Sequence, residues 1–386
     1  MDSGARAEVR VLTVVGSLML GGAETYVSRV VRTIRSYGVD MEICALERTG
    51  PLLAQLEEDG VLVHDTPFPS PNYRSTMSRL LATVDAIRRV VKAGRFDIVH
   101  TYLFWADVLG VTGARLAGCR RIVISRRALH GWTHGPKARY HAMEQASNLL
   151  ANELIANSTA VLQDAEAHER ILPSVRTVIY SGVDVNQYEP ARPRADGPVR
   201  LVTVGALAPR KGQEYAVEAI AILARSGVKA TLELVGTGPD EAMLRRKVDD
   251  AGLGGLVTFA GQQEDPRPYL KHADIFLLPS RQEGFPVALL EAMASALPAI
   301  ATDVGGSAEA LIDGKGGRVV PPQQPKAIAA AIAEMAVDRP RLPEMGRFNR
   351  QRVTEKFSIE ASARRLADWY IHGPLPRKKG TSPAGR

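Results

Sequence analysis

Cysteine is nearly absent from this chain of 386 residues, which holds Cys44 and Cys119 and therefore too few thiols for a disulfide framework. The opening apolar run, Val11 to Leu20, is too short to span a bilayer and is interrupted by Gly16 and Ser17. It also lacks the basic lead-in and the cleavage site of a signal peptide. We interpret it as a first buried strand and expect a cytoplasmic protein, with contact at the inner face of the membrane left open.

Acidic residues are missing between Val108 and Met143, a segment that is rich in cations and also contains Trp132. Three interpretations stay open for it: a solvated basic face, a site for an anionic acceptor, and contact with an acidic membrane surface. Nucleic acid is not an expected partner, because no helix-turn-helix, zinc-ligand or aromatic ribonucleoprotein pattern accompanies the charge. The basic residues and histidines of the segment are Arg115, Arg120, Arg121, Arg126, Arg127, His130, His134, Lys137, Arg139 and His141.

Metal-binding patterns are also missing. The sequence contains no Asp-x-Asp and no His/Cys cluster with the spacing of metal ligands. We therefore expect no metal ion and no cofactor beyond a co-substrate.

Short β-branched runs alternate with helical stretches in both halves of the chain. Continuous apolar strands separated by helices predict parallel sheets with right-handed crossovers. The expected strands of the first half are Val9–Val15, Val39–Ala45, Val61–His64, Ile98–His100, Arg121–Ser125 and Leu154–Ala156, and the clearest helices are Thr25–Tyr37, Ser78–Ala93 and Trp105–Ala117. The pattern restarts with Val199–Val204, Ala230–Val235, Val257–Ala260, Ile275–Leu278 and Ala299–Ala301.

A polar, proline-rich break divides the two halves, and it predicts an interdomain linker over residues 186–198. We expect an α/β protein with two doubly wound, Rossmann-like domains, 1–185 and 199–357, that face each other across a cleft. A last helix over 358–372 should close the molecule, followed by a disordered basic tail over 373–386.

The segment from Glu283 to Glu291 is the most informative stretch of the sequence. A strand ends before it, a glycine turn follows, and Pro286 suits the start of a helix, whose free N–H groups attract a diphosphate. Glu291 lies about five residues into that helix, an offset of roughly 7 Å at 1.5 Å per residue. One carboxylate can then face a sugar and the other a ribose.

Glu-Gly-Phe-Pro followed by the second glutamate resembles the signature of retaining GT-B glycosyltransferases, family 4 in particular. Other segments resemble this family in the same order along nearly the whole chain: Gly21-Gly22-Ala23-Glu24, Ser181-Gly182-Val183-Asp184, Gly205 to Gly212, Leu234 to Pro239 and Thr302 to Glu309.

The resemblance implies a donor site for a nucleotide diphosphate sugar, with UDP favoured. Lys211 would offset the charge on the departing diphosphate, Glu283 would orient sugar hydroxyls, and Glu291 would hold the ribose. The expected donor-binding residues are Gly21, Gly22, Gly205, Arg210, Lys211, Gly236, Gly238, Glu283, Gly284, Phe285, Pro286 and Glu291.

The sequence departs from the family pattern at Ala206, where relatives commonly carry an arginine. Arg210 or Arg281 would have to replace it, unless Lys211 and the helix start suffice. Relatives also present a catalytic histidine from the first domain, and here Arg127, His130 and His100 are the candidates for that position.

The implied reaction is a metal-independent hexosyl transfer that retains the anomeric configuration. The acceptor would be a small molecule such as an aminocyclitol, or a lipid or glycan intermediate. Two alternatives remain: a nucleotide-sugar epimerase or phosphorylase of the same fold, and a non-catalytic partner of a glycosyltransferase.

Overall fold

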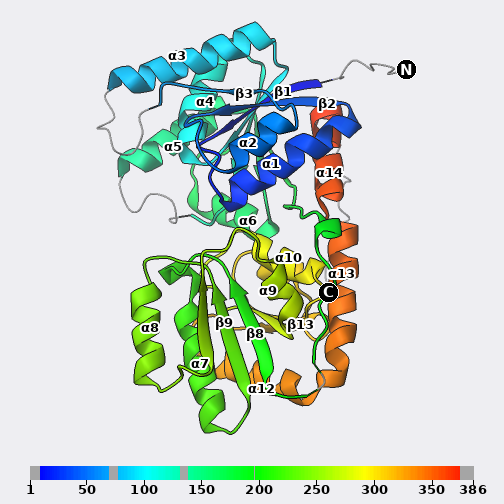
Figure 1. The fold of residues 1–386 in the computed structure, drawn as a ribbon. Coiled ribbons are helices and arrows are strands. Elements are labelled where there is room, and N and C mark those ends of the chain that lie inside the picture. The colour runs from blue at the N-terminus through cyan, green and yellow to red at the C-terminus, as the bar shows by residue number, and fades with distance from the viewer. Residues whose placement is uncertain (1–8, 69–76, 131–137, 195, 374–386) are drawn as a thin grey trace, which may run out of the picture.

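The protein, seen in a computed structural model that describes residues 9–68, 77–130, 138–194 and 196–373, has two α/β domains, one above the other (Figure 1). Each domain has a parallel sheet with helices on both faces, which confirms the double Rossmann-like architecture expected from the sequence. No helix in these ranges is long and apolar enough to cross a membrane.

The first sheet has the strand order β3-β2-β1-β4-β5-β6-β7. Its neighbouring strands pair in parallel, so that Val11 of β1 lies beside Met41 on one side and Ile98 on the other. The strands are β1 (Val9–Val15), β2 (Val39–Ala45), β3 (Val63–His64), β4 (Ile98–Tyr102), β5 (Arg121–Arg126), β6 (Glu153–Ala156) and β7 (Val175–Val178).

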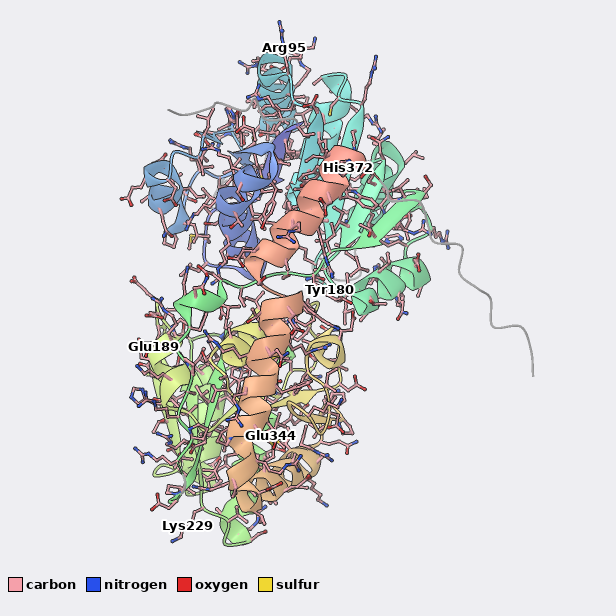
Figure 2. The ribbon with its side chains drawn as sticks, turned by 90° about the vertical axis from the view of Figure 1, so that its right-hand side faces the viewer. Arg95, Tyr180, Glu189, Lys229, Glu344 and His372 are labelled. Atoms are coloured by element: carbon pink, nitrogen blue, oxygen red, sulfur yellow. The ribbon has the colours of Figure 1, made fainter. Side chains whose placement is uncertain are left out.

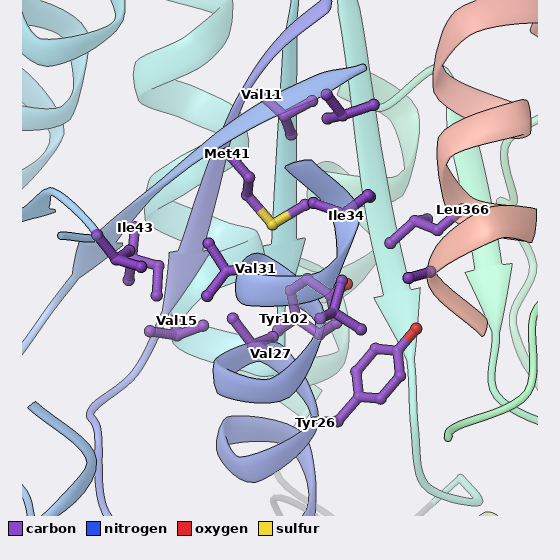
Figure 3. Close-up of a cluster of buried hydrophobic side chains, with 14 of the residues drawn as sticks. Val11, Val15, Tyr26, Val27, Val31, Ile34, Met41, Ile43, Tyr102 and Leu366 are labelled. Atoms are coloured by element: carbon purple, nitrogen blue, oxygen red, sulfur yellow. The ribbon is translucent and has the colours of Figure 1, made fainter. Parts of the chain in front are cut away.

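Helices cover both faces of this sheet because its strands carry apolar side chains on both sides. Val11 and Val15 of β1 pack into the cluster under α1, whereas Leu12 and Val14 pack into the cluster under α3 and α4. Figure 3 shows the first of these clusters around Met41. The helices of the domain are α1 (Gly22–Ile34), α2 (Leu52–Glu58), α3 (Met77–Gly94), α4 (Phe104–Leu116), α5 (Ala138–Leu150) and α6 (Thr159–His168), with the 3-10 helix η1 (Arg35–Tyr37).

The second sheet has the order β10-β9-β8-β11-β12-β13. Its strands are β8 (Val199–Val204), β9 (Ala230–Val235), β10 (Val257–Gly261), β11 (Ile275–Leu278), β12 (Ala299–Thr302) and β13 (Gly317–Val320). The helices are α7 (Gln213–Arg225), α8 (Glu241–Asp250), α9 (Arg267–His272), α10 (Val287–Ala294), α11 (Ser307–Ala310), α12 (Pro325–Val337) and α13 (Leu342–Lys356), with 3-10 helices η3 (Pro209–Lys211) and η4 (Arg339–Arg341).

The predicted linker segment is packed against the second domain. It begins within the 3-10 helix η2 (Val185–Gln187), and Tyr188 is only 4% exposed. The Ala191 N–H donates to the Ser295 carbonyl at 2.7 Å. The connection is therefore held in place and is not a loose spacer.

The last helix, α14 (Ile359–His372), crosses back to the first domain directly after α13, so that the two helices run along both domains (Figure 2). Leu366 and Tyr370 are each 1% exposed and belong to the same cluster as β1 and α1. The Trp369 indole N–H donates to Glu153 at 2.6 Å. The expected tail after Gly373 lies outside the described residues.

Candidate active site

The turn between β11 and α10 is fixed by packing and by hydrogen bonds. Pro286 is the N-cap of α10, with φ −77° and ψ 102°, so the helix begins one residue later than the proline. Phe285 is 5% exposed and lies 5.0 Å from the Tyr180 ring, centroid to centroid. The free N–H groups of the first turn of α10 therefore stand at the carboxyl end of the sheet, where α/β folds bind ligands.

Lys211 and Glu283, predicted from separate motifs, form an ion pair in the structure. The Lys211 Nζ lies 2.6 Å from Glu283 Oε1, and the Ser280 hydroxyl donates to the same oxygen at 2.7 Å. Gly212, with φ +63°, lets the lysine loop approach so closely that an added Cβ would collide with the Pro279 carbonyl. The structure thus joins the loops after β8 and β11 at one cation and one carboxylate.

The other glycines of the second domain serve close contacts between loops. Gly205 (φ +144°) and Gly236 (φ +138°) adopt conformations that favour glycine. A Cβ at Gly236 would meet the Gly205 carbonyl, and one at Gly238 would meet the Leu207 carbonyl. Their predicted contact with the donor remains a prediction.

The glycine loop of the first domain leads into α1. Gly21 is the N-cap of α1, and a Cβ there would collide with the Glu24 carboxylate, whereas Gly22 has open space around it. Burial raises the pKa of Glu24, against the lowering effects of a backbone hydrogen bond and of Arg127. Gly22 is thus the point of this loop that a ligand could approach closely.

The two domains meet at Gly284. A Cβ added there would collide with the backbone carbonyl of Arg127, at the end of β5. The Ser158 hydroxyl donates to the Gly284 carbonyl at 3.1 Å, and the Gly306 N–H donates to the same oxygen at 2.8 Å. The turn from Glu283 to Pro286 in the second domain therefore lies against the carboxyl end of the first sheet.

Arg127 turns its side chain into the first domain. Its guanidinium lies 4.2 Å from the Tyr26 ring centroid and donates to the Ser181 hydroxyl at 2.7 Å. Burial lowers its pKa, partly offset by Tyr26, Tyr102 and Glu24. Its backbone carbonyl lies against Gly284, whereas its guanidinium is directed toward Tyr26 and Ser181.

The two histidine candidates have different surroundings. His130 is exposed, and its ring stacks on His168 at 5.2 Å and meets His141 at 5.8 Å. His100 is fully buried, and its ring nitrogens lie 2.5 Å from the Tyr370 hydroxyl and 2.9 Å from the Ser125 hydroxyl. Burial, with Arg127 and Arg121, lowers the pKa of His100 to about 3, so it is a neutral structural residue.

The two arginines proposed to replace the residue missing at Ala206 lie on the loops that carry Lys211 and Glu283. The N–H of Arg281 donates to the Arg210 carbonyl at 2.8 Å, and the Arg281 guanidinium lies 3.9 Å from Glu214. Both are therefore near the predicted diphosphate position, and the choice between them stays open.

The acid-free segment is not simply a solvated basic face. Arg126 is 7% exposed and is ion-paired with Asp107 at 2.8 Å and Glu169 at 2.9 Å, while Arg121 pairs with Glu153 at 2.6 Å. Some cations of this segment therefore form ion pairs that stabilise the first domain. Trp132, His134 and Lys137 lie outside the described residues. Among the residues that the structure describes, no group of three or more His, Cys, Asp or Glu could hold a metal ion.

The sequence reasoning missed contacts that cross between the domains. Arg29 of α1 donates to Glu291 Oε1 at 3.0 Å. Glu309 accepts the backbone N–H groups of Thr159 at 2.9 Å and Ala160 at 2.8 Å, at the start of α6. These partners are far apart in the sequence, so no local pattern could pair them.

Two Rossmann-like domains that meet at Gly284, beside a lysine–glutamate pair of the second domain and the start of α10, form the architecture of the GT-B glycosyltransferases. The chain belongs to glycosyltransferase family 4: residues 20–187 match the model described as Glycosyltransferase Family 4, and residues 198–338 match that of Glycosyl transferases group 1.

Relatives agree with this membership, and a solved structure shares the fold. A GDP-mannose-dependent alpha-(1-6)-phosphatidylinositol monomannoside mannosyltransferase of Mycobacterium tuberculosis is 30% identical, over 78% of this chain and 80% of its own. A D-inositol 3-phosphate glycosyltransferase of Paenarthrobacter aurescens is 25% identical, over 85% and 87%. The crystal structure of Anabaena HepE with UDP shares the fold, with a TM-score of 0.79 and 20% identity, over 93% of this chain and 98% of its own.

Proposed function

We propose that the protein is a retaining, metal-independent hexosyltransferase that moves a sugar from a nucleotide diphosphate donor to an acceptor hydroxyl. The observation that carries this proposal is the Lys211–Glu283 pair, 2.6 Å apart, on the loops beside the N-terminus of α10. A cation and free backbone N–H groups stabilise a departing diphosphate, which needs no metal ion for this purpose.

In the proposed reaction the anomeric C–O bond breaks first, and both of its electrons leave with the diphosphate. The departing phosphate oxygen then takes the proton of the acceptor hydroxyl, and that hydroxyl oxygen forms the new bond from the same face of the sugar. Lys211 stabilises the leaving group, Glu283 orients the sugar hydroxyls, and Glu291 holds the ribose.

UDP is the donor nucleotide we expect, with GDP as the alternative that the name of the mycobacterial relative supports. For the acceptor we propose a cyclitol, free or lipid-linked, because the relatives' names include inositol 3-phosphate and a phosphatidylinositol mannoside. A lipid-linked acceptor would bring the protein to the membrane surface.

The test combines a binding panel with product analysis. Thermal shifts with UDP- and GDP-hexoses identify the donor, since specific binding stabilises the folded state. The donor is then incubated with D-inositol 3-phosphate or with phosphatidylinositol vesicles, with and without EDTA, and the product anomer is assigned by NMR. We expect free nucleotide and a product with the donor's anomeric configuration in EDTA.

Four results would contradict the proposal. An inverted anomer would exclude retention, and loss of activity in EDTA would exclude metal independence. An epimerised donor without transfer would favour the epimerase alternative, and no binding of any nucleotide diphosphate would favour a non-catalytic partner.

A further inference from the structure

Glu291 is held by side chains from outside its own domain. The Arg29 Nη2, on α1 of the first domain, lies 3.0 Å from Glu291 Oε1. The hydroxyl of Tyr188, in the connection between the domains, interacts electrostatically with both Glu291 and Arg29. Three segments of the chain therefore meet at one carboxylate.

This group is enclosed, which makes its geometry specific. The side chains of Arg29 and Glu291 are 20% and 13% exposed, and Tyr188 is 4% exposed. Burying two charges costs free energy that only well-directed hydrogen bonds recover. The carboxylate thus has one favoured orientation, set by a charge-assisted hydrogen bond from Arg29 beside the Tyr188 hydroxyl.

Glu291 and Arg29 can each form a further hydrogen bond to a ligand. An ionised carboxylate has about four lone-pair positions, and the hydrogen bond from Arg29 engages one of them. The other terminal nitrogen of Arg29, Nη1, is buried and has no hydrogen-bond partner among the described residues. An unsatisfied buried donor is costly, so this nitrogen favours a group that is not part of the chain.

We propose that Arg29 and Tyr188 are positioning residues that orient Glu291 toward the ribose hydroxyls of the donor nucleotide. The inference rests on the proposed function, in which Glu291 holds the ribose. Because Arg29 belongs to the opposite domain, recognition of the ribose is complete only when the two domains are together.

The test compares each nucleotide with its analogue that lacks the ribose hydroxyls. Dissociation constants of UDP and 2′,3′-dideoxy-UDP, and of GDP and 2′,3′-dideoxy-GDP, are measured by calorimetry for the wild type and for Arg29→Gln, Arg29→Lys, Tyr188→Phe and Glu291→Gln. Arg32→Gln is the matched control, because Arg32 lies one turn further along α1 and pairs with Asp59 of its own domain at 2.8 Å. Circular dichroism checks that each variant is folded.

We expect the wild type and Arg32→Gln to favour the ribonucleotide about 10-fold or more, since hydrogen bonds to a charged group are the stronger ones. Arg29→Gln and Glu291→Gln should reduce this ratio to about 2-fold, and Arg29→Lys should restore part of it, because the ammonium keeps the charge without the fork geometry. Tyr188→Phe should give an intermediate ratio. If Arg29 and Tyr188 had only a structural role, their substitution would weaken the binding of the nucleotide and of its dideoxy analogue equally. The ratio of the two dissociation constants would then stay unchanged.

The outcomes separate the inference from the proposed function. If Glu291→Gln loses the preference for ribose but Arg29→Gln keeps it, the positioning role is wrong and the role of Glu291 stands. If Glu291→Gln keeps the preference, the role of Glu291 itself is wrong, and the inference falls with it. If the wild type binds none of the nucleotides, the proposed function fails.

Discussion

Lys211 is the residue on which the proposed chemistry depends most. Its ammonium, 2.6 Å from Glu283, would stabilise charge that develops on the departing diphosphate. We expect Lys211→Ala to lower kcat by about 10²- to 10³-fold with a smaller change in KM, as for the loss of one preorganised electrostatic group. Steady-state kinetics with the identified donor measures this.

Lys211→Arg and Lys229→Ala are the controls for that experiment. Arginine keeps the charge in a different geometry, so we expect it to recover part of the activity. Lys229 is an exposed lysine of the same domain and should be neutral. If Lys211→Ala kept more than half of the wild-type kcat, Lys211 would not stabilise the leaving group.

His100 gives a prediction for stability against pH. Its pKa falls from 6.5 to about 3 on folding, chiefly through burial, so the unfolded chain binds its proton more readily. The contribution of His100 to the unfolding free energy is complete above about pH 6.5 and is lost progressively as the pH falls toward 3. At 1.36 kcal/mol per pKa unit, about 2 kcal/mol of unfolding free energy is lost from this group between pH 7 and pH 5.

Urea unfolding at pH 7 and pH 5 measures this loss, with His100→Gln as the comparison. Glutamine keeps hydrogen bonds toward Tyr370 and Ser125 but does not titrate, so the variant should lose about 2 kcal/mol less than the wild type over this interval. Equal losses in both proteins would assign the pH dependence to other groups.

At the residue scale, the sequence predicts what lies within one motif. Glu283 and Pro286 stand beside a strand end and a helix start, so their place in the fold follows from local pattern. Arg29 could not be predicted, because its position on α1 indicates an ordinary polar helix residue and its partner lies 262 positions away. Arg127 was a candidate beyond the end of β5, and only the fold could show that its side chain turns inward.

At the scale of elements, the carboxylate of Glu309 links α11 of one domain to α6 of the other. It accepts the first N–H groups of α6, and the Tyr180 hydroxyl donates to it at 2.8 Å. A carboxylate at a helix N-terminus is worth about 1 to 2 kcal/mol through capping and the helix dipole. We expect Glu309→Gln to accelerate hydrogen exchange in the peptide with Thr159 and Ala160 by about 10-fold.

Two variants control for general loosening of the fold. Glu360→Gln changes an exposed glutamate in the first turn of α14 and should leave that peptide unchanged. Tyr180→Phe removes one of the three bonds and should have a smaller effect. Unchanged exchange in Glu309→Gln would mean that α6 is held by other contacts.

Element prediction succeeded where strands are buried on both faces. β1, β8 and β9 have the predicted bounds, because each run is rich in apolar and β-branched residues and is followed directly by a glycine. The edge strands β7 and β13 were missed. All four residues of β7 are only partly buried, and β13 begins at Gly317, so neither has the composition of a central strand.

At the scale of the whole molecule, α13 and α14 join the domains into one cooperative unit. Val353 of α13 is buried in the core of the second domain, and Leu366 of α14 is buried in the core of the first. α14 follows α13 almost directly. Unfolding of either domain therefore disturbs the helix that completes the core of the other domain. We therefore expect the two domains to unfold together, although multidomain proteins commonly unfold in separate steps.

Leu366→Ala and Val353→Ala test this coupling as a matched pair, one in each domain. Truncating a buried leucine costs about 2 to 5 kcal/mol through lost transfer energy and the cavity that remains, and a valine costs less. In scanning calorimetry we expect one transition in the wild type, displaced as a whole to lower temperature by either variant. Two transitions, of which Leu366→Ala moves one and Val353→Ala the other, would mean that the domains unfold independently and that α14 belongs to the first domain alone.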